Sequence, residues 1–350
     1  MRVVVVGATG NVGTSVLRSL AAEPAVHEIY GIARRLPPTD FAKTAWIAAD
    51  VATDDLAPHF QGADAVVHLA WQIQPSRDEE RLYQANVAGS RRVFEAVARA
   101  GVGALVYASS IGTYSPGPKE YPVDESWPTN GVETSFYSRH KAEVERLLDD
   151  FEDDNPRIRV VRLRPALIFK REAATEIRRL FAGPFLPAFL MRRALIPAVP
   201  DVERLRFQCV HSYDVAEAYR AAIVSDVRGA FNIASEPILD PDELSDLFGA
   251  RKIRMNEHAI RILTELTWRM RLQPTPPGWV DMAFETPLLD WSRATKELDW
   301  EPRYSSKETL LELIEGLHDR ADAPTPPLAN ETAGPARFRE VLTGVGSRPA

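Results

Sequence analysis

Residues 3–13, which read VVVVGATGNVG, decide the fold of this chain. Val3 to Val6 is a continuous β-branched run, as expected of a strand buried on both faces, and a helical apolar spacing follows Gly13. Gly7, Gly10 and Gly13 fall directly between the two elements. Glycines at this spacing permit a tight turn, close approach of phosphates and close packing of helix on strand. The stretch therefore predicts a dinucleotide pyrophosphate at a helix N-terminus, with an ordinary glycine turn as the alternative.

Strands and helices alternate through the first half of the chain. One predicted helix, 79–100, ends at Gly101, as helices often do. The predicted strands cover residues 29–33, 46–48, 66–69, 105–108 and 160–163. Such alternation predicts an α/β fold with a Rossmann-type, doubly wound parallel sheet.

The chain divides into three parts on the same criteria. We expect an NAD(P)-binding domain over residues 1–165, to which residues 207–235 return as a strand (207–210), a helix (213–224) and a strand (230–233). Residues 166–320, with a last helix at 306–319, should form mainly a smaller C-terminal substrate-binding lobe. Residues 321–350 have little apolar periodicity, so a mobile tail is expected there.

Composition excludes several classes of protein. A single cysteine rules out an internal disulfide framework, and no run reaches the ~18 apolar residues of a membrane span. A net charge of −7 argues against a nucleic-acid partner. The five basic residues of 171–193 alternate with Phe181, Phe185, Phe189 and Leu190, which is typical of an amphipathic lid. We therefore expect a cytoplasmic protein with a small-molecule substrate and no membrane partner.

The end of the second predicted strand indicates which dinucleotide binds. An acidic residue at this place accepts hydrogen bonds from the adenosine ribose and repels a 2′-phosphate. Here the sequence is Gly31-Ile32-Ala33-Arg34-Arg35, with no carboxylate and two guanidinium groups that can bind a phosphate. NADP(H) is therefore predicted, and NAD(H) is the alternative.

Tyr137 and Lys141 are four residues apart in a predicted helix that continues to Phe151. They therefore lie on one face, where a fixed cation can favour the phenolate of the tyrosine. A Ser-Ser segment, Ser109-Ser110, follows the fifth predicted strand. Taken alone, a Tyr/Lys pair at this spacing is a weak signal, but its conjunction with the Ser-Ser segment and the glycine turn is specific.

Over residues 1–318 the chain resembles the extended short-chain dehydrogenase/reductase family, which includes the NAD-dependent epimerase/dehydratase proteins. The resemblance rests on the glycine turn and on further motifs, namely Asp50-Val51, His68-Leu69-Ala70, Asn86-Val87-Ala88-Gly89, Ser109-Ser110, Tyr137/Lys141, Arg164-Pro165-Ala166 and His211-Ser212-Tyr213-Asp214-Val215. It implies the fold described above and homodimerisation through the two long helices that contain Ala88 and Lys141.

The resemblance also implies roles for individual residues. Ser110 would bond the reacting oxygen, Tyr137 would donate or remove its proton, and Lys141 would bind the nicotinamide ribose and lower the pKa of the tyrosine. Ser109 is an alternative to Ser110. The predicted cofactor contacts are Gly7, Thr9, Gly10, Asn11, Val12, Gly13, Arg34, Arg35, Asp50, Val51, Leu69, Ala70, Tyr137, Lys141 and Pro165.

Other polar residues receive structural roles. His68 and His211, at strand ends, are interpreted as structural, and Asp214 is interpreted as a helix cap. No cluster of histidine, cysteine and carboxylate residues has metal-ligand spacing, so no metal is expected.

Departures from the family pattern bear on the reaction. Dehydratases carry Asp-Glu after the catalytic Ser/Thr, where this chain has Ile111-Gly112, so dehydration is disfavoured. Nucleotide-sugar epimerases usually have an asparagine after the sixth strand and an arginine at the position of Phe207. Here the first region reads Arg164-Pro165-Ala166-Leu167, and Arg206 is only adjacent to the second position.

Three hypotheses follow, in order of preference. The first is an NADP(H)-dependent reductase or dehydrogenase that acts on a carbonyl or alcohol. The second is a nucleotide-sugar 4-epimerase with tightly bound NAD, and the third is a non-catalytic dinucleotide sensor. A reductase or dehydrogenase of this kind needs an apolar substrate pocket. The predicted lobe has aromatic and apolar residues that could line such a pocket or could equally form the core of the lobe. They are Phe181, Phe185, Phe189, Leu190, Trp268, Met270, Trp279 and Met282.

Overall fold

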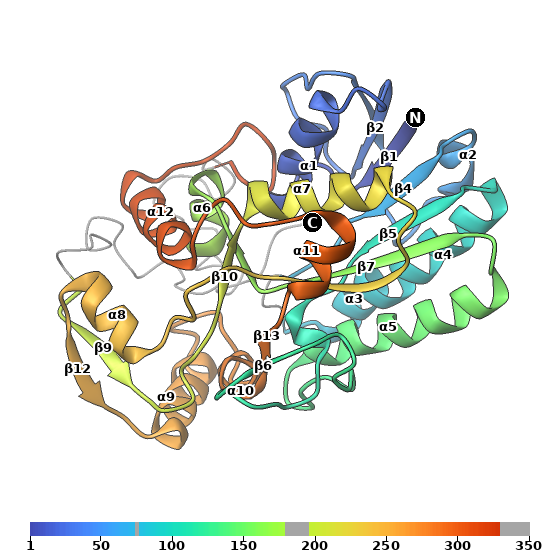
Figure 1. Ribbon diagram of the computed structural model, residues 1–350. Helices are drawn as coiled ribbons and strands as arrows, with labels where there is room; N and C mark the ends of the chain where they lie inside the picture. Colours follow the sequence, from blue (N-terminus) through green and yellow to red (C-terminus); the bar gives the residue numbers. More distant parts are fainter. Residues whose placement is uncertain (74–76, 179–195, 330–350) are drawn as a thin grey trace.

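A parallel sheet forms the centre of the molecule in the computed structural model, which describes residues 1–73, 77–178 and 196–329 (Figure 1). Within these residues the sheet has seven strands in the order β11-β7-β5-β4-β1-β2-β3, and all neighbours run parallel. The strands are β1 (Arg2–Val6), β2 (Glu28–Ala33), β3 (Thr44–Ala48), β4 (Ala65–His68), β5 (Ala104–Ala108), β7 (Arg159–Pro165) and β11 (Gly229–Ile233). The order reverses between β1 and β4, which is where ligands of doubly wound sheets bind.

Helices cover both faces of the sheet (Figure 1). One face carries α1 (Asn11–Ala22), α7 (Ser212–Val224) and α11 (Ser292–Leu298). The other carries α2 (Ala57–Phe60), α4 (Gly89–Ala100) and α5 (Phe136–Asp154). The predicted doubly wound α/β fold is confirmed.

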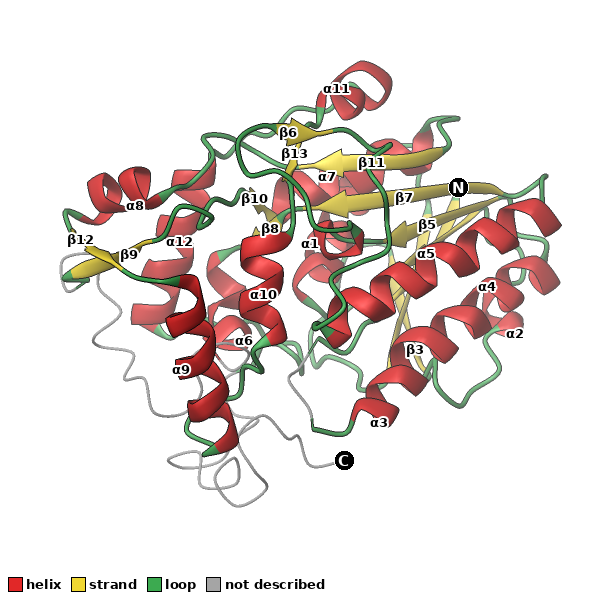
Figure 2. Cartoon of the chain, turned by 90° about the horizontal axis from the view of Figure 1, so that it is seen from below, coloured by secondary structure: helices red, strands yellow, loops and turns green. Residues whose placement is uncertain are grey.

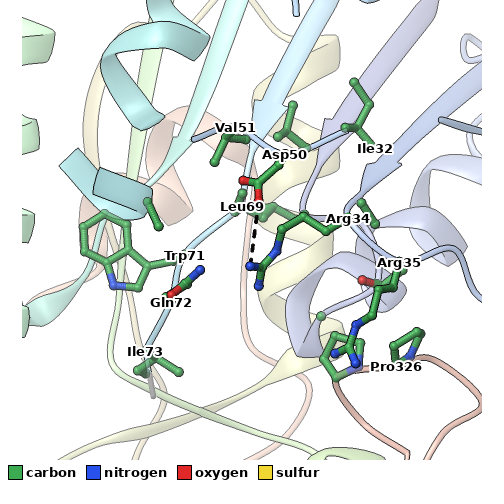
Figure 3. Close-up of a pocket in the computed structure, with 18 of the residues that line it drawn as sticks. Ile32, Arg34, Arg35, Asp50, Val51, Leu69, Trp71, Gln72, Ile73 and Pro326 are labelled. Atoms are coloured by element: carbon green, nitrogen blue, oxygen red, sulfur yellow. Dashed lines mark ion pairs between the residues drawn. The ribbon is translucent and has the colours of Figure 1, made fainter. Parts of the chain in front are cut away.

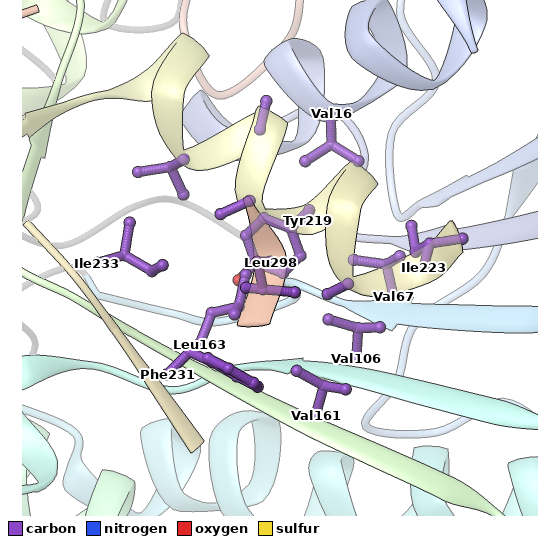
Figure 4. Close-up of a cluster of buried hydrophobic side chains, with 14 of the residues drawn as sticks. Val16, Val67, Val106, Val161, Leu163, Tyr219, Ile223, Phe231, Ile233 and Leu298 are labelled. Atoms are coloured by element: carbon purple, nitrogen blue, oxygen red, sulfur yellow. The ribbon is translucent and has the colours of Figure 1, made fainter. Parts of the chain in front are cut away.

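The hydrophobic core fills the space between the sheet and these helices. Under α7, Tyr219 and Ile223 pack on Val106, Val161 and Phe231 of three neighbouring strands (Figure 4). These side chains are at most 1% exposed. Burial of one such side chain contributes about 1.5–3 kcal/mol, so the strands are held rigidly and their carboxyl ends form a fixed platform.

The remaining elements form a lobe beyond the carboxyl ends of the strands (Figure 2). Its helices are α6 (Ala174–Ile177), α8 (Pro241–Phe248), α9 (Glu257–Arg269), α10 (Gly278–Glu285) and α12 (Ser306–Asp319). Its two-stranded sheets pair β8 (Leu167–Phe169) with β10 (Cys209–His211), β9 (Ala198–Asp201) with β12 (Arg251–Arg254), and β6 (Pro122–Val123) with β13 (Leu288–Leu289).

Three expectations need correction. Residues 207–210 do not return to the central sheet, because β10 pairs with β8, whereas α7 and β11 do return. The predicted helix 79–100 is α3 (Glu79–Tyr83), a π-helical turn (Gln84–Ala88) and α4 in succession. The start of the predicted tail is packed, because Leu328 is fully buried. The rest of the tail, 330–350, lies outside the described residues.

Candidate active site

The glycine turn joins β1 to α1 with almost no free space behind it. Gly7 has φ +87°, and a Cβ there would lie 2.6 Å from the Ala70 amide nitrogen. A Cβ on Gly13 would lie 2.5 Å from the Gly7 carbonyl oxygen, which explains the absence of a side chain at both positions. At Gly10 the nearest atom would be 3.6 Å away, an ordinary van der Waals contact, so a Cβ would fit there without a clash. Of the three glycines, Gly10 is therefore the one whose side-chain position is not blocked by the protein itself.

The N-terminus of α1 has the properties of an anion site. Gly10 is its N-cap, and among the described residues no side chain caps the first turn. Uncapped N–H groups and the helix dipole both favour a bound phosphate. The Oδ1 atom of Asn11, in this turn, is buried without a hydrogen-bond partner in the described part of the chain. The uncapped N-terminus of α1 fits the pyrophosphate predicted from sequence, whereas the unpaired Asn11 oxygen is a hydrogen-bond acceptor and does not itself attract an anion.

A pocket opens from this turn across the carboxyl ends of β1, β2, β3 and β4 (Figure 3). Nine predicted cofactor residues line it, namely Gly7, Thr9, Gly10, Arg34, Arg35, Asp50, Val51, Leu69 and Ala70. The others, Asn11, Val12, Gly13, Tyr137, Lys141 and Pro165, are not part of this lining. Pro165 is buried at the end of β7, where it is paired with Ile233.

Two arginines supply most of the charge at the β2 end of the pocket. Arg34 is directed at Asp50, with 3.9 Å between Nη1 and Oδ2 (Figure 3). Partial burial, and then the charge of Arg34, lower the pKa of Arg35. The two guanidinium groups therefore bring like charges to this end of the pocket, where a bound anion would be favoured. The pocket lining also includes Arg81 and the carboxylates of Asp78 and Glu176.

A buried lysine supports the start of α1 from the lobe side. Lys170 follows β8, and its Nζ donates to the Asn11 carbonyl oxygen (2.8 Å), Thr14 Oγ1 (2.7 Å) and Ser15 Oγ (3.0 Å). All three ammonium protons are thereby used. Burial lowers the pKa of Lys170 to about 8. The sequence analysis missed this residue, because a lysine directly after a short apolar strand carries no local signal.

Ser110 and Tyr137 come together at the end of β5. Ser110 Oγ accepts a hydrogen bond from the Gly112 amide (3.0 Å), which starts a short 3-10 turn. Burial raises the pKa of Tyr137 to about 12, and a hydrogen bond with Ser110 opposes the shift. A tyrosine with this pKa is protonated at neutral pH, so it can donate a proton.

Two small residues fix the position of the Tyr137 ring. A Cβ on Gly112 would lie 2.8 Å from Tyr137 Cε1, so only glycine leaves room for the ring. Ser138 Oγ donates to the Gly112 carbonyl oxygen and accepts from the Val132 amide. Gly112 was noticed in the sequence only as a departure from the dehydratase pattern, and its packing role was missed.

Lys141 lies one turn after Tyr137 and is buried. Its Nζ donates to the Ala108 carbonyl oxygen (2.6 Å) and the Tyr107 hydroxyl (3.4 Å), and it lies 5.9 Å from the centroid of the Tyr137 ring. Burial lowers the pKa of Lys141 well below its usual value. The expectation that Lys141 lowers the pKa of Tyr137 is not met in this structure, because the ammonium is directed to the β5 backbone.

The alternative serine, Ser109, forms a hydrogen bond with a buried carboxylate. Its hydroxyl donates to Glu145 Oε1 (2.5 Å), and the same carboxylate is paired with Arg162 and Arg164. Burial alone would raise the pKa of Glu145, but Arg164 and Arg162 hold it at about 2. Ser109 therefore belongs to a buried ionic network beneath the site, and Ser110 is the serine beside Tyr137.

Aromatic side chains enclose Tyr137. Trp279 of α10 lies 5.0 Å away and Trp71 lies 6.0 Å away, measured between ring centroids. Trp71 also covers Lys141, whose Nζ lies 3.6 Å from the centroid of the Trp71 ring. Trp71, Gln72 and Ile73 line the pocket as well (Figure 3). The segment thus lies both at the pocket that starts from the glycine turn and against Tyr137, and the sequence analysis missed it.

Asn86, in the π-helical turn, holds this segment in place. Its Oδ1 accepts from the Gln72 amide (2.7 Å) and its Nδ2 donates to the Gln72 carbonyl oxygen (3.0 Å). Asn86 is fully buried, and Gln72 is half-buried, so the two bonds tie a pocket-lining residue to the interior. The Asn-Val-Ala-Gly motif was noticed in the sequence, and the structure gives its asparagine this positioning role.

The predicted lobe aromatics divide into three groups. Trp279 and Met282 are buried beside Tyr137. Trp268 packs against Arg77, and Met270 is 59% exposed, so neither lines this site. Residues 179–195, which contain Phe181, Phe185, Phe189, Leu190 and the proposed lid, lie outside the described residues.

The two histidines have structural surroundings. His68 is buried, its Nε2 lies 2.9 Å from Ser90 Oγ, and burial lowers its pKa to about 3. His211 is the N-cap of α7, where its Nδ1 accepts from the Tyr213 amide, so the expectation that Asp214 is the cap is wrong. Asp214 instead accepts from the Tyr304 amide.

Two further features concern metals and membranes. Across residues 1–73, 77–178 and 196–329, no group of three or more histidine, cysteine or carboxylate side chains is placed to hold a metal ion. No helix in the same ranges combines the length and the apolar character needed to cross a bilayer.

The model of the NAD dependent epimerase/dehydratase family matches residues 3–234. The chain belongs to this family. Its curated relatives include sterol-4-alpha-carboxylate 3-dehydrogenase ERG26 of Saccharomyces cerevisiae, 30% identical over 183 residues, which are 51% of this chain and 46% of that protein. Another is the uncharacterized protein Rv2047c of Mycobacterium tuberculosis, 25% identical over 313 residues. That match covers 89% of this chain but 29% of the relative.

Solved structures share the fold. UDP-glucose 4-epimerase of Thermotoga maritima superposes with a TM-score of 0.67 at 18% identity, and the match covers 91% of this chain and 99% of that one. At this identity the likeness shows the fold alone, which is of the Rossmann type.

Proposed function

We propose that this member of the family is an NADP(H)-dependent oxidoreductase that transfers hydride between the cofactor and an apolar carbonyl or alcohol. The observation that carries the proposal is the pairing of Ser110 with a protonated Tyr137 at the end of β5, beside a phosphate cradle at the end of β1. In a parallel sheet both groups face the same edge, so one extended ligand can reach both.

Each residue has a distinct part in this proposal. Tyr137 donates its hydroxyl proton to the carbonyl oxygen during reduction and takes a proton back during alcohol oxidation. Ser110 donates a hydrogen bond to the same oxygen and so orients it. Lys141 would hold the nicotinamide ribose and return a proton to Tyr137. A bound nicotinamide supplies or accepts the hydride at the carbon atom.

The preference for NADP(H) rests on the β2 end of the pocket. Arg34 and Arg35 both line it, and their mutual repulsion favours a dianionic group between them. NAD(H) has no phosphate at the adenosine ribose, so it would leave this repulsion uncompensated. Asp50, 3.9 Å from Arg34, is the competing ion-pair partner that a 2′-phosphate would have to displace.

The walls around Tyr137 support an apolar substrate. Trp71, Trp279 and Met282 surround the phenol, and burial dominates its pKa. Such walls offer contact area and few hydrogen bonds, which suits an aromatic or aliphatic ketone better than a sugar.

A direct experiment tests the proposal. The purified protein is denatured, any released nucleotide is identified, and the native protein is assayed with NADPH and NADH against a panel of apolar ketones. An empty site that takes up NADPH reversibly, and ketone reduction that is faster with NADPH, support the proposal. Faster reduction with NADH would overturn the assignment of NADP(H). No reduction of any ketone in the panel would overturn the assignment of an apolar carbonyl substrate.

A second function, 4-epimerisation of a nucleotide sugar, has one structural feature in its favour. Lys119, Arg204 and Arg206 cluster in the lobe, and burial, with the charges of the two arginines, lowers the pKa of Lys119 to about 7. Such a cluster suits a diphosphate. However, Lys119 and Arg204 already donate to backbone carbonyl oxygens. Stoichiometric NAD released on denaturation, and interconversion of UDP-sugars, would favour this function.

A further inference from the structure

One side of the lobe carries an unusual concentration of exposed apolar side chains. Of the eleven large hydrophobic residues that the structure describes as exposed, seven fall within residues 253–272. They are Ile253, Met255, Ile262, Leu263, Leu266, Met270 and Leu272. We call them, together with Arg251, Arg254 and Arg271, the β12–α9 surface.

The apolar residues of α9 share one face. Ile262, Leu263 and Leu266 are 64%, 56% and 54% exposed, and their spacing places them within a third of the helix circumference. The opposite face packs on α10, where Arg261 of α9 is paired with Asp281 (2.8 Å). Helix α9 lies along the outside of the lobe, beside α10 (Figure 2). The exposed face is therefore a defined apolar stripe on a helix that is packed against the lobe.

Cationic residues are concentrated in the same segment of the chain as the stripe. Residues 251–272 contain six Lys/Arg and two Glu, a net charge of +4 in a chain whose net charge is −7. Lys252, Arg261 and Arg269 have carboxylate partners. Arg251, Arg254 and Arg271 are exposed, and no ion pair to them is found among residues 1–73, 77–178 and 196–329. The segment that carries the stripe thus also carries three exposed arginines without a carboxylate partner among the described residues.

We propose that the β12–α9 surface docks reversibly on an anionic phospholipid membrane. A helix with an apolar stripe and flanking Arg/Lys lies in the plane of the interface, with aliphatic side chains among the acyl chains and cations at the phosphates. A second copy of the chain fits less well, because a two-fold contact would set this cationic surface against itself. The expectation of no membrane partner rested on spanning segments, so it does not address surface docking.

The position of the surface gives docking a consequence. Helix α9 packs on α10, and Trp279 of α10 contacts Tyr137. A docked lobe would therefore place the apolar surroundings of Tyr137 next to the bilayer. Docking itself needs neither cofactor nor substrate, so it can be tested independently of the proposed function.

Co-sedimentation with vesicles tests the proposal on the full chain. We expect binding to vesicles of equal parts phosphatidylcholine and phosphatidylglycerol, weak binding to phosphatidylcholine alone, and release by raised salt. Replacing Ile262, Leu263 and Leu266 by Gln should abolish sedimentation. Replacing Arg251, Arg254 and Arg271 by Gln should weaken it at least tenfold, since each cation contributes roughly fivefold. A matched control replaces Leu36 and Val224, exposed apolar residues outside the lobe, by Gln and should bind as wild type.

Three results would overturn the proposal. The first is failure of the wild-type chain to sediment with phosphatidylglycerol vesicles. The second is a melting temperature that falls in the Ile262/Leu263/Leu266 variant but not in the Leu36/Val224 control, which would show that the chain itself covers the stripe. The third is concentration-dependent self-association, by light scattering, that the same variant abolishes.

Discussion

The two halves of the candidate site are built in different ways. The nucleotide half consists of a glycine turn, a helix N-terminus and two arginines, all within the first 35 residues. The reactive half gathers Trp71, Ser110, Tyr137 and Trp279 from four distant segments and packs them tightly. The nucleotide half depends on backbone geometry and leaves space for a ligand. The reactive half depends on side-chain packing, which fixes the position of the proton-transfer group, Tyr137. Substitutions in the two halves should therefore fail in different ways.

The largest effect is expected in the reactive half. Tyr137→Phe keeps the ring between Trp71 and Trp279 but removes the proton donor, so kcat/KM for ketone reduction should fall by about 10²–10⁴. The Kd for NADPH should stay unchanged, by fluorescence titration. Tyr83→Phe, which removes a hydroxyl bonded to Glu143 on the surface of α5, is the matched control and should keep its activity. Turnover that survives in Tyr137→Phe would refute the role of the phenol.

Alanine substitutions at two glycines of the nucleotide half should separate an effect on NADPH affinity from an effect on the stability of the fold. Gly10→Ala has space for its methyl group, so the melting temperature should hold while NADPH affinity falls at least about tenfold. Gly13→Ala places a methyl group 2.5 Å from the Gly7 carbonyl oxygen and should cost about 1–3 kcal/mol of unfolding free energy. Thermal melts and nucleotide titrations of both variants check this. The reverse pattern would contradict the geometry of the turn.

Substitution of either pocket arginine should change the preference for NADPH over NADH, by less than the loss of activity expected for Tyr137→Phe. Removal of one hydrogen-bonded charge contact costs about 1.5–3 kcal/mol, so Arg34→Gln or Arg35→Gln should lower the preference for NADPH over NADH about 10- to 100-fold. The ratio of the two kcat/KM values measures it. Arg18→Gln, on the exposed side of α1, should leave the ratio unchanged. An unaltered ratio in both pocket variants would remove the basis for NADP(H).

The smallest effect concerns Lys170 beneath α1. Its folded-state pKa, lowered by burial from 10.5 to about 8, means that the unfolded chain binds its proton more tightly. The unfolding free energy should therefore rise by about 1–3 kcal/mol as pH increases from 8 to 10.5. Lys170→Met should reduce this rise, and Lys119 and Lys141, whose pKa values are also lowered by burial, should supply the remainder. Urea titrations measure it, with the exposed Lys296→Met as control. A rise of equal size in Lys170→Met would refute the assignment.

The sequence predicted one half of the site better than the other for a physical reason. Glycines with a forced conformation, such as Gly7, and a buried valine run act through the local backbone, so a short stretch of sequence contains their signal. Tyr137 and Ser110 were found through motif spacing. The roles of Trp71 and Gly112 depend on which distant side chains pack against them, and no local pattern encodes that.

The same reason explains the errors in the fold. Residues 207–210 have the pattern of a sheet strand, yet their partner is β8, which was not anticipated. Leu328 lies in a proline-rich segment that resembles a tail, but it is buried by tertiary contacts. Local propensity gives the element type, and the partner is decided by packing elsewhere in the chain.

The most direct test of the account is isotope transfer. NADPH in which deuterium replaces both hydrogens at the nicotinamide C4 is incubated with the protein and an apolar ketone, and the alcohol is analysed by mass spectrometry. The account predicts one deuterium on the carbinol carbon with wild type and none above background with Tyr137→Phe. An unlabelled alcohol, or equal labelling with the two proteins, would contradict it.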